Sequence, residues 1–453
     1  MSSVDWSSLQ RIVDGPVRLP GAAGFAAASE AFNKRYADVR PAAVLSVAGA
    51  ADVGRAVGWA RERDVPFVLR GGGHSYAGGS VGTGLVLDLG GLGGVRVEPS
   101  TGRVVVGGGV RMGALSEQLQ KYDLTIPLGN SDDVGIGGLV LGGGVAAVSR
   151  TYGLTCDALL ETELVLADGS TVTCNETEHA DLFWACRGGG GGNFGVNTSF
   201  TFQARPVPDV STCLLLWSWP QAVDVMVTMQ EVMRRAPDAL AARIGLSRSV
   251  PTGGVVSVAG QYLGPARELR ELLAPVLAVA EPGRIDILDQ NYWEAQRSRR
   301  HATSADAFAV RTRFAQHPLP AAAVATAVAM VDRWPGSSCP DGAGIALFTW
   351  GGAISRVPPA ATAFPYRDTL FLVSMDTAWT SEDSSGVVAA NLAWLHTLYE
   401  EMGMFTGDGA YVNFPDPDLS DWRTAYYGPN LAKLADVKRR YDSDRVFHFA
   451  QAI

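Results

Sequence analysis

The stretch Arg70-Gly71-Gly72-Gly73-His74-Ser75-Tyr76-Ala77-Gly78-Gly79 is the most informative part of the chain. Its glycines surround one imidazole, directly after an apolar run at 65–69 that predicts a strand. Because glycine has no Cβ, such a loop can turn sharply and let a ligand approach its backbone closely. Successive N–H groups of a turn also form a concavity that suits a pyrophosphate. The loop could therefore hold His74 against a cofactor ring, or it could be a glycine-rich turn with a hydrogen-bonded histidine.

The size and composition of the chain predict a globular enzyme with more than one domain. Its 453 residues exceed the length at which a single hydrophobic core usually stops growing. Hydrophobic residues make up 47% and charged residues 18%, which excludes a disordered chain. The net charge of −9 disfavours nucleic acid and anionic membrane surfaces as partners. We therefore expect a small-molecule substrate, and the oligomeric state stays open.

The cellular compartment is predicted from what the sequence lacks. There is no apolar run of 18 residues that could span a membrane. The first residues lack the charged and apolar regions of a secretory signal. Five cysteines contain no CxxC pair, which fits reduced thiols. The six histidines are scattered, so we expect no metal site. Together these features predict a cytoplasmic protein.

The first 200 residues alternate strand and helix patterns. Residues 41–47 and 65–69 read as strands, and apolar residues at helical spacing between them predict a helix capped by Asp52, which makes a βαβ unit. Further strands are expected at 103–106, 159–166 and 200–202, a helix at 114–122 and a second glycine loop at 135–144. The segment Arg205-Pro206-Val207-Pro208 is the best boundary candidate because two prolines interrupt it.

The pattern changes between about 210 and 400. Short apolar runs at 214–217, 255–258, 345–350 and 370–375 alternate with helical segments, which favours an antiparallel sheet backed by helices. One helix would bury a face of five apolar side chains and contain a proline, Pro275. The last residues resemble the first half again and include a basic helix at 431–441. We expect one domain at 1–205 that is completed by a C-terminal return at 405–453, and a second domain at 206–404.

The run Gly190-Gly191-Gly192-Asn193-Phe194-Gly195 formally matches GxGxxG. A dinucleotide fingerprint of the Rossmann kind must follow a strand and open a helix. Here the run precedes residues 196–202, which favour a strand. We therefore do not expect a Rossmann site.

Several segments together resemble the berberine-bridge-enzyme-like flavoproteins, a branch of the vanillyl-alcohol-oxidase type of FAD-linked oxidases. The resemblance covers nearly the whole chain. It is carried by the loop at 70–80 and by the motifs Val134-Gly135-Ile136-Gly137-Gly138, Leu141-Gly142-Gly143-Gly144, Arg150-Thr151-Tyr152-Gly153-Leu154, Asp181 to Gly195, Trp350-Gly351-Gly352-Ala353-Ile354, Phe364-Pro365-Tyr366-Arg367, Tyr411-Val412-Asn413-Phe414-Pro415-Asp416 and Val446 to Ile453. It implies an α+β, two-domain PCMH-type FAD-binding fold. The FAD-binding domain would comprise 1–205 and 405–453, and the substrate-binding domain at 206–404 would be an antiparallel sheet backed by helices.

The resemblance also implies how the cofactor is held. In that family a loop histidine is bonded to the 8α-methyl carbon of the FAD isoalloxazine ring, and His74 stands at the matching position. The implied cofactor-binding residues are His74, Arg70, Gly71, Gly72, Gly73, Ser75, Ser131, Val134, Gly137, Gly138, Gly142, Val196 and Asn413.

The second loop departs from the commoner family pattern. Many members have Cys-Pro-Thr-Val-Gly, whose thiol forms a second bond to the flavin, where this chain has Ser131-Asp132-Asp133-Val134-Gly135. A hydroxyl is a far poorer nucleophile than a thiolate. We therefore expect covalent attachment through His74 only, which weakens a comparison with oligosaccharide oxidases that have both bonds. Val134 matches the family's oxygen gate, where a small residue favours reaction with O2, although it could simply be a core side chain.

The catalytic residues implied by the resemblance are Tyr411 and Tyr76. Tyr411 matches the tyrosine of the family's YxN motif and is the candidate base, with Asn413 beside it. Because an isolated phenol titrates near 10, it needs a positive charge or hydrogen-bond donors at its oxygen, and the sequence does not show what supplies them. Tyr411 and Asn413 could also be a structural pair, and Tyr76 could equally pack against the loop. The candidate substrate-pocket residues are Trp350, Trp293 and Tyr292, each of which could equally fill core.

Three functions remain open at this point. The first is an FAD-linked oxidase that acts on a C–OH, C–N or activated C–H bond of a natural-product-like molecule and passes electrons to molecular oxygen, giving H2O2. The second is a protein of the same fold that catalyses a net non-oxidative cyclisation or rearrangement of a polyketide-like substrate. The third is a flavin-binding protein without turnover.

Overall fold

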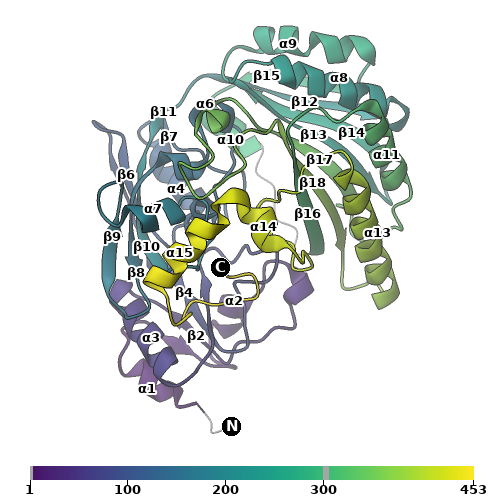
Figure 1. Ribbon diagram of the computed structural model, residues 1–453. Helices are drawn as coiled ribbons and strands as arrows, with labels where there is room; N and C mark the ends of the chain where they lie inside the picture. The colour runs from purple at the N-terminus through teal and green to yellow at the C-terminus, as the bar shows by residue number, and fades with distance from the viewer. Residues whose placement is uncertain (1–3, 299–305) are drawn as a thin grey trace.

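The computed structural model describes residues 4–298 and 306–453. Two smaller sheets and a larger seven-stranded sheet form its framework, with the C-terminal helices lying between the early strands and the large sheet (Figure 1). The mixed α+β fold predicted from the sequence is confirmed.

The first sheet confirms the parallel unit but adds a strand to it. Its order is β1 (Val17–Arg18), β2 (Ala43–Ser46), β4 (Leu85–Asp88), β3 (Phe67–Arg70). Strands β2 and β3 are both parallel to β4, so the two predicted strands flank β4 and do not pair directly. The helix between them, α3 (Ala50–Glu62), begins after Gly49, so the prediction that Asp52 caps it was wrong. The Asp52 carboxylate instead accepts hydrogen bonds from the N–H groups of Asp14, Gly15 and Ala48, which holds the N-terminal segment in place.

The second sheet supports the rest of the early segment. Its antiparallel order is β5 (Val95–Glu98), β6 (Arg103–Gly107), β10 (Val196–Gln203), β8 (Leu159–Val165), β9 (Thr171–Cys174). A two-stranded ribbon pairs β7 (Leu124–Thr125) with β11 (Arg205–Pro206). Because the glycine run at 190–195 lies between α7 (Ala180–Ala185) and β10, it opens a strand, as expected of a segment that is not a Rossmann loop.

The second glycine segment contains a helix, which the sequence did not predict. Residues 135–144 were expected to be a loop, but α5 (Ile136–Leu141) occupies most of them. Ile136, Val140 and Leu141 bury their side chains, which explains why a segment with two internal glycines is helical. Further helices in this part are α1 (Trp6–Gln10), α2 (Phe25–Ser29), α4 (Met112–Gln120) and α6 (Ser149–Tyr152).

The third sheet is entirely antiparallel, as predicted for residues after 210. Its order is β15 (Arg284–Gln290), β12 (Val210–Ser218), β14 (Gly253–Tyr262), β13 (Leu240–Ser249), β17 (Ala343–Thr349), β18 (Phe371–Trp379), β16 (Ala307–Ala315). Helices cover its outer face in Figure 1: α8 (Ala222–Arg235), α9 (Ala266–Val279), α11 (Ala321–Asp332) and α13 (Ser385–Gly403). The predicted apolar face of α9 packs in the core, and the helix runs through Pro275.

The two faces of this sheet are told apart by their contacts. On β18, the Thr377 hydroxyl bonds to Asn391 of α13, so this residue and its alternate neighbours face the helices. Thr312 of β16 pairs with Ser374 of β18, and the Thr312 hydroxyl accepts the N–H of Tyr411. Ser374 and its alternate neighbours on β18 therefore face the C-terminal segment. The second face, which we call the inner face, borders the candidate site.

The chain returns to the first half at its C-terminus. Here α14 (Trp422–Tyr427) and α15 (Leu431–Tyr441) follow, and α15 packs against α7. The buried Lys438 ammonium donates to the carbonyls of Asn193 and Phe447, and the N–H of Ile453 donates to Asn193 Oδ1. The two bonds to Asn193 join the predicted return segment to the loop before β10, while the boundaries at 205 and 405 stay predictions.

The remaining short elements complete the description. They are α10 (Tyr292–Ser298), α12 (Ala353–Arg356) and the 3-10 turns η1 (Lys34–Tyr36), η2 (Leu89–Gly91), η3 (Thr155–Ala158), η4 (Trp219–Gln221) and η5 (Gly428–Asn430). In the part of the chain that the structure describes, no helix combines the length and apolar character that crossing a membrane requires.

Candidate active site

The glycine loop that follows β3 presents His74 beside an aromatic ring. The rings of Phe32 and His74 stack with centroids 3.9 Å apart and planes inclined by 24°. Burial lowers the pKa of His74 to about 4, although the nearby Asp133 carboxylate acts in the opposite direction. The imidazole is therefore neutral near pH 7 and keeps a free electron pair for bond formation.

The backbone of the His74 loop lies directly against the backbone of the loop at 131–135, with no side chain between them. A Cβ built on Gly72 would stand 2.2 Å from the nitrogen of Gly135 and 2.8 Å from the carbonyl oxygen of Asp133. The second loop is itself held in place, because the carbonyl of Val134 accepts the Met112 N–H at 2.9 Å. Glycine at position 72 is thus required by the close approach of the two loops.

Two buried polar atoms beside these loops have no hydrogen-bond partner within the described residues: Arg70 Nη1 and Ser131 Oγ. Arg70 is 8% exposed, and its guanidinium lies against Gly73, where a Cβ would stand 2.8 Å from it. A Cβ on Gly138 would meet no atom within 4 Å. An unpaired cation beside glycine backbone and open space fits an anionic pyrophosphate. The residues present therefore fit the flavin dinucleotide that the resemblance implies.

The structure identifies the hydrogen-bond donors to the Tyr411 oxygen, which the sequence did not show. Its side chain is 1% exposed, and its oxygen accepts the N–H of Gly144 at 3.0 Å and Asn413 Nδ2 at 3.3 Å. The N–H of Val145 bonds to the same oxygen. Burial raises the pKa of Tyr411 above its usual value, and these three donors act against that rise because they favour the phenolate. The donors are thus amides, and no cation is among them.

The Asn413 side chain packs directly against the backbone of Gly142. Asn413 Nδ2 also donates to the carbonyl of Leu139 at 2.9 Å. Its Oδ1 lies only 2.0 Å from where a Cβ on Gly142 would be, so any larger residue there would displace the amide. The pair fixes the end of α5 beneath the Tyr411 hydroxyl.

Tyr76 belongs to an aromatic group that the sequence did not identify. Its ring is 5.1 Å from Phe414 and 4.9 Å from Phe308, measured between centroids. Phe414 also contacts Tyr411 at 5.2 Å, so it connects the two predicted catalytic tyrosines. Burial raises the pKa of Tyr76 to about 12, which keeps its hydroxyl neutral. The Tyr-x-Asn-Phe motif contained Phe414, but nothing in the sequence placed Phe308 beside it.

Asn33 is a second residue that the sequence analysis missed. Its Nδ2 donates to the carbonyls of Tyr76 at 2.8 Å and Phe308 at 2.9 Å, while its Oδ1 accepts the Phe308 N–H at 3.1 Å. The side chain is 1% exposed, so these bonds are shielded from water. One amide thereby joins the His74 loop to the large sheet.

Replacing Asn33 with Ala should destabilise the protein by about 3 kcal/mol, because several buried backbone groups lose their partner. The free energy of unfolding in urea measures this change. A loss below about 1 kcal/mol would show that these bonds do not hold the loop to the sheet.

The predicted pocket residues Trp350, Tyr292 and Trp293 are buried in the hydrophobic core, and their assignment to a pocket stays a prediction. They are 0%, 1% and 3% exposed. Trp350 Nε1 donates to the carbonyl of Tyr366, and the Tyr292 hydroxyl bonds to Thr125. Sequence composition could not separate them from pocket residues, since aromatic side chains fill both kinds of position.

The other predicted cofactor residues have visible structural contacts. Ser75 Oγ accepts the N–H of Gly79 at 2.8 Å, which closes the loop. Gly137 approaches the carbonyl of Gly108 and the Phe200 ring. Val196 is 0% exposed, and its backbone pairs with Val165 of β8. Their roles toward the cofactor stay predictions.

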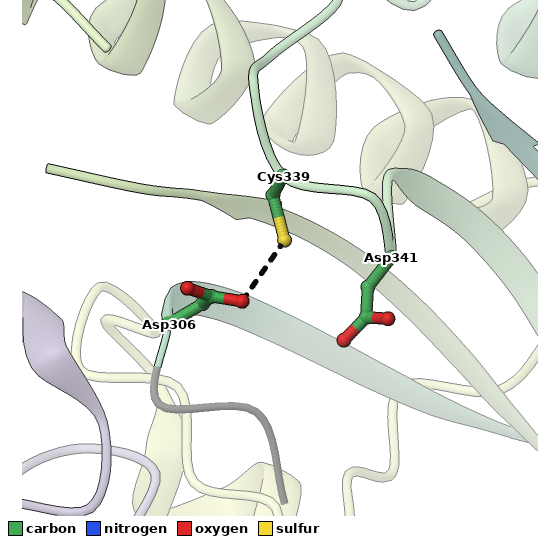
Figure 2. Close-up of side chains that lie close together, drawn as sticks. All are labelled: Asp306, Cys339 and Asp341. Carbon is green, nitrogen blue, oxygen red and sulfur yellow. Dashed lines mark hydrogen bonds between the residues drawn. The ribbon is translucent and has the colours of Figure 1, made fainter. Parts of the chain in front are cut away.

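One group of potential metal ligands lies at an edge of the large sheet. Asp306, Cys339 and Asp341 bring one ligand atom each within 4.8 Å of the others (Figure 2). The Cys339 thiol donates to the Asp306 carboxylate at 3.4 Å, and burial raises the pKa of Cys339 to about 11. Because a metal needs the thiolate, this hydrogen bond accounts for the group without an ion.

The fold and the glycine cradle define the chain as an FAD-linked oxidoreductase, and comparison with known proteins agrees. Residues 41–175 match the FAD binding domain family, and residues 410–453 match the family described as berberine and berberine like. An uncharacterised FAD-linked oxidoreductase of Bacillus subtilis, YgaK, is 34% identical, with 93% of this chain and 92% of that protein covered. The xylooligosaccharide oxidase of Thermothelomyces thermophilus is 30% identical, covering 93% of this chain and 88% of the oxidase.

Solved structures show the same relationship. The wild-type BBE-like 1 protein of Physcomitrella patens superposes with a TM-score of 0.90 at 27% identity, covering 100% of this chain and 99% of that one. The chain therefore belongs to the berberine-bridge-enzyme-like family of FAD-linked oxidoreductases. This confirms the resemblance and the fold class expected from the sequence.

Proposed function

We propose that this enzyme carries FAD through a single covalent bond from His74 and oxidises a C–OH, C–N or activated C–H bond of a natural-product-like small molecule. The observation that carries the proposal is the buried Tyr411 oxygen with its amide donors, connected through Phe414 and Tyr76 to the His74 loop. A group able to accept a proton thus borders the loop that would hold the cofactor.

Each part of the site has a defined task in this proposal. Bound FAD would supply hydride acceptance from the substrate and two-electron reduction of O2; with the hydride's proton and the proton removed from the substrate, the product would be H2O2. The Tyr411 oxygen accepts the substrate proton, and the N–H groups of Gly144 and Val145 stabilise the charge on that oxygen. Arg70 and the glycine N–H groups bind the pyrophosphate, and Val134 leaves O2 access.

Two further features support parts of the proposal. Ser131 has no thiol, which supports attachment through His74 only. The buried cysteines Cys156, Cys174, Cys186 and Cys339 carry reduced thiols, which supports a reducing, cytoplasmic location. Some relatives are named xylooligosaccharide, glucooligosaccharide and chitooligosaccharide oxidases. Oligosaccharides should therefore be tested as substrates together with aromatic alcohols and amines.

The mass of the denatured, purified chain tests the covalent bond. We expect wild type and Ser131→Ala to carry the mass of one FAD and His74→Ala to carry none, because only the imidazole is a competent nucleophile here. Formation of H2O2 during turnover then tests the oxidase activity. A wild-type chain without added mass, or an added mass that persists in His74→Ala, would contradict the proposal.

A further inference from the structure

The inner face of the large sheet carries a carboxylate that the reaction above does not use. Asp376 lies on β18, two residues from Ser374, whose cross-strand partner Thr312 accepts the Tyr411 N–H. Side chains two residues apart on a strand share a face. Asp376 therefore faces the same side as the Tyr411 segment and lies away from helix α13.

No hydrogen bond to the Asp376 side chain is formed by the described residues, although it is only partly exposed. Its cross-strand neighbours explain this, because it pairs with Val310 on β16 and Gly344 on β17. Neither neighbour has a side-chain donor. Donors to this carboxylate therefore come from solvent or from a ligand, and a ligand that excludes the solvent must replace them.

The surroundings of Asp376 combine small residues with aromatic rings. Gly344 and Ala346 lie on the same face of β17, and Gly245 lies on that face of β13. Phe308, two residues from Val310 on β16, contacts the Tyr76 ring. Tyr76 is also close enough for the Asp376 charge to raise its pKa. The carboxylate thus lies near the predicted catalytic tyrosine, over a surface of small side chains.

The charged groups around Asp376 favour a cationic ligand. Arg243 of β13 lowers the pKa of Asp376, but its side chain is exposed and its Cζ lies 5.6 Å from the Phe348 ring centroid. Asp341, in the turn before β17, acts in the opposite direction and adds negative potential. Burial is the largest influence, and together these raise the pKa of Asp376 to about 6. The carboxylate is therefore ionised at pH 8 and protonated at pH 5.

We propose that Asp376 is a specificity-determining residue that binds an ammonium group of the substrate, with the Tyr76 and Phe308 rings contacting the adjoining apolar part. This inference rests on the proposed function, since it assigns the substrate of that same site as an amine. An ammonium offers several hydrogen-bond donors and a full charge to the unpaired carboxylate, whereas a hydroxyl offers one donor. Aromatic rings beside the carboxylate also favour a cation.

Calorimetric titration of the purified holoenzyme with benzylamine and benzyl alcohol tests this inference. The two probes share a ring and differ in the group offered to Asp376. At pH 8 we expect benzylammonium to bind at least about tenfold more tightly than benzyl alcohol, a difference of about 1.4 kcal/mol. In Asp376→Asn, and in wild type at pH 5, we expect this preference to fall below about threefold.

Asp341→Asn is the matched control, because it removes a neighbouring negative charge from a residue outside the inner face. It should retain most of the preference. Equal affinity of wild type for both probes, absence of binding by either probe, or a preference that survives Asp376→Asn would overturn the inference. Because the readout is binding, it is distinguishable from failure of the flavin bond or of the oxidation, which the mass and H2O2 measurements report.

Discussion

Tyr411→Phe should bind flavin as wild type does and lose turnover by about 10²-fold or more, the usual contribution of a general base. The substitution removes only the oxygen that accepts the bonds from Gly144 and Asn413. His74, Arg70 and the glycine loop stay in place, so the denatured chain should keep its added mass. The rate of flavin reduction by substrate under anaerobic conditions measures the proton-transfer defect directly. Unchanged turnover would remove Tyr411 from the reaction.

Tyr426→Phe is the matched control for this variant. Tyr426 is also buried, and its hydroxyl accepts a backbone N–H, that of Asp416, at 2.9 Å. Both substitutions should therefore cost a similar free energy of unfolding, about 1–3 kcal/mol. Only Tyr411→Phe should reduce turnover. An equal loss in both variants would indicate that the effect is structural.

The pH profile provides a second test of Tyr411. A base must be deprotonated to accept a proton, and burial raises the pKa of Tyr411 above its usual value. Turnover should therefore keep rising with pH beyond 9 as the phenolate becomes populated. A profile that levels off above pH 7 would instead match Asp376, whose pKa is raised to about 6.

The sequence predicted the individual segments of the site better than their mutual arrangement. Its glycine loop and its Tyr-x-Asn motif are local patterns, and the structure places the Tyr411 segment beside the loop through Phe414 and Tyr76. The two backbone donors to Tyr411 come from Gly144 and Val145, far away in the sequence, whereas the side-chain donor Asn413 belongs to the predicted motif. Every residue except proline has a backbone N–H group, so no sequence pattern could have shown which of them donate to Tyr411.

The same limit explains the errors in the fold. Strand β4 has only four residues and lies between glycines, so its run of apolar side chains was too short to be recognised as a strand. Asp52 has the residue type of a helix cap, yet it accepts N–H groups from a distant N-terminal segment. Helix α5 contains two glycines, and tertiary burial of Ile136 and Val140 overrides their low helix propensity. In the large sheet, the apolar runs located parts of β12, β14, β17 and β18, whereas β13, β15 and β16 were not predicted.

Gly72→Ala should separate the two loops on which flavin attachment depends. The new Cβ would stand 2.2 Å from the Gly135 nitrogen, and backbone cannot move aside as a flexible side chain can. We expect a loss of about 1–3 kcal/mol in the free energy of unfolding, as for other overpacked sites, together with loss of most of the covalent flavin mass. Gly58→Ala is the control, because a Cβ on this residue of α3 meets no atom within 4 Å, and it should be neutral or slightly stabilising. A Gly72→Ala protein with wild-type stability and a full complement of covalent flavin would show that close contact between the loops is not what positions His74.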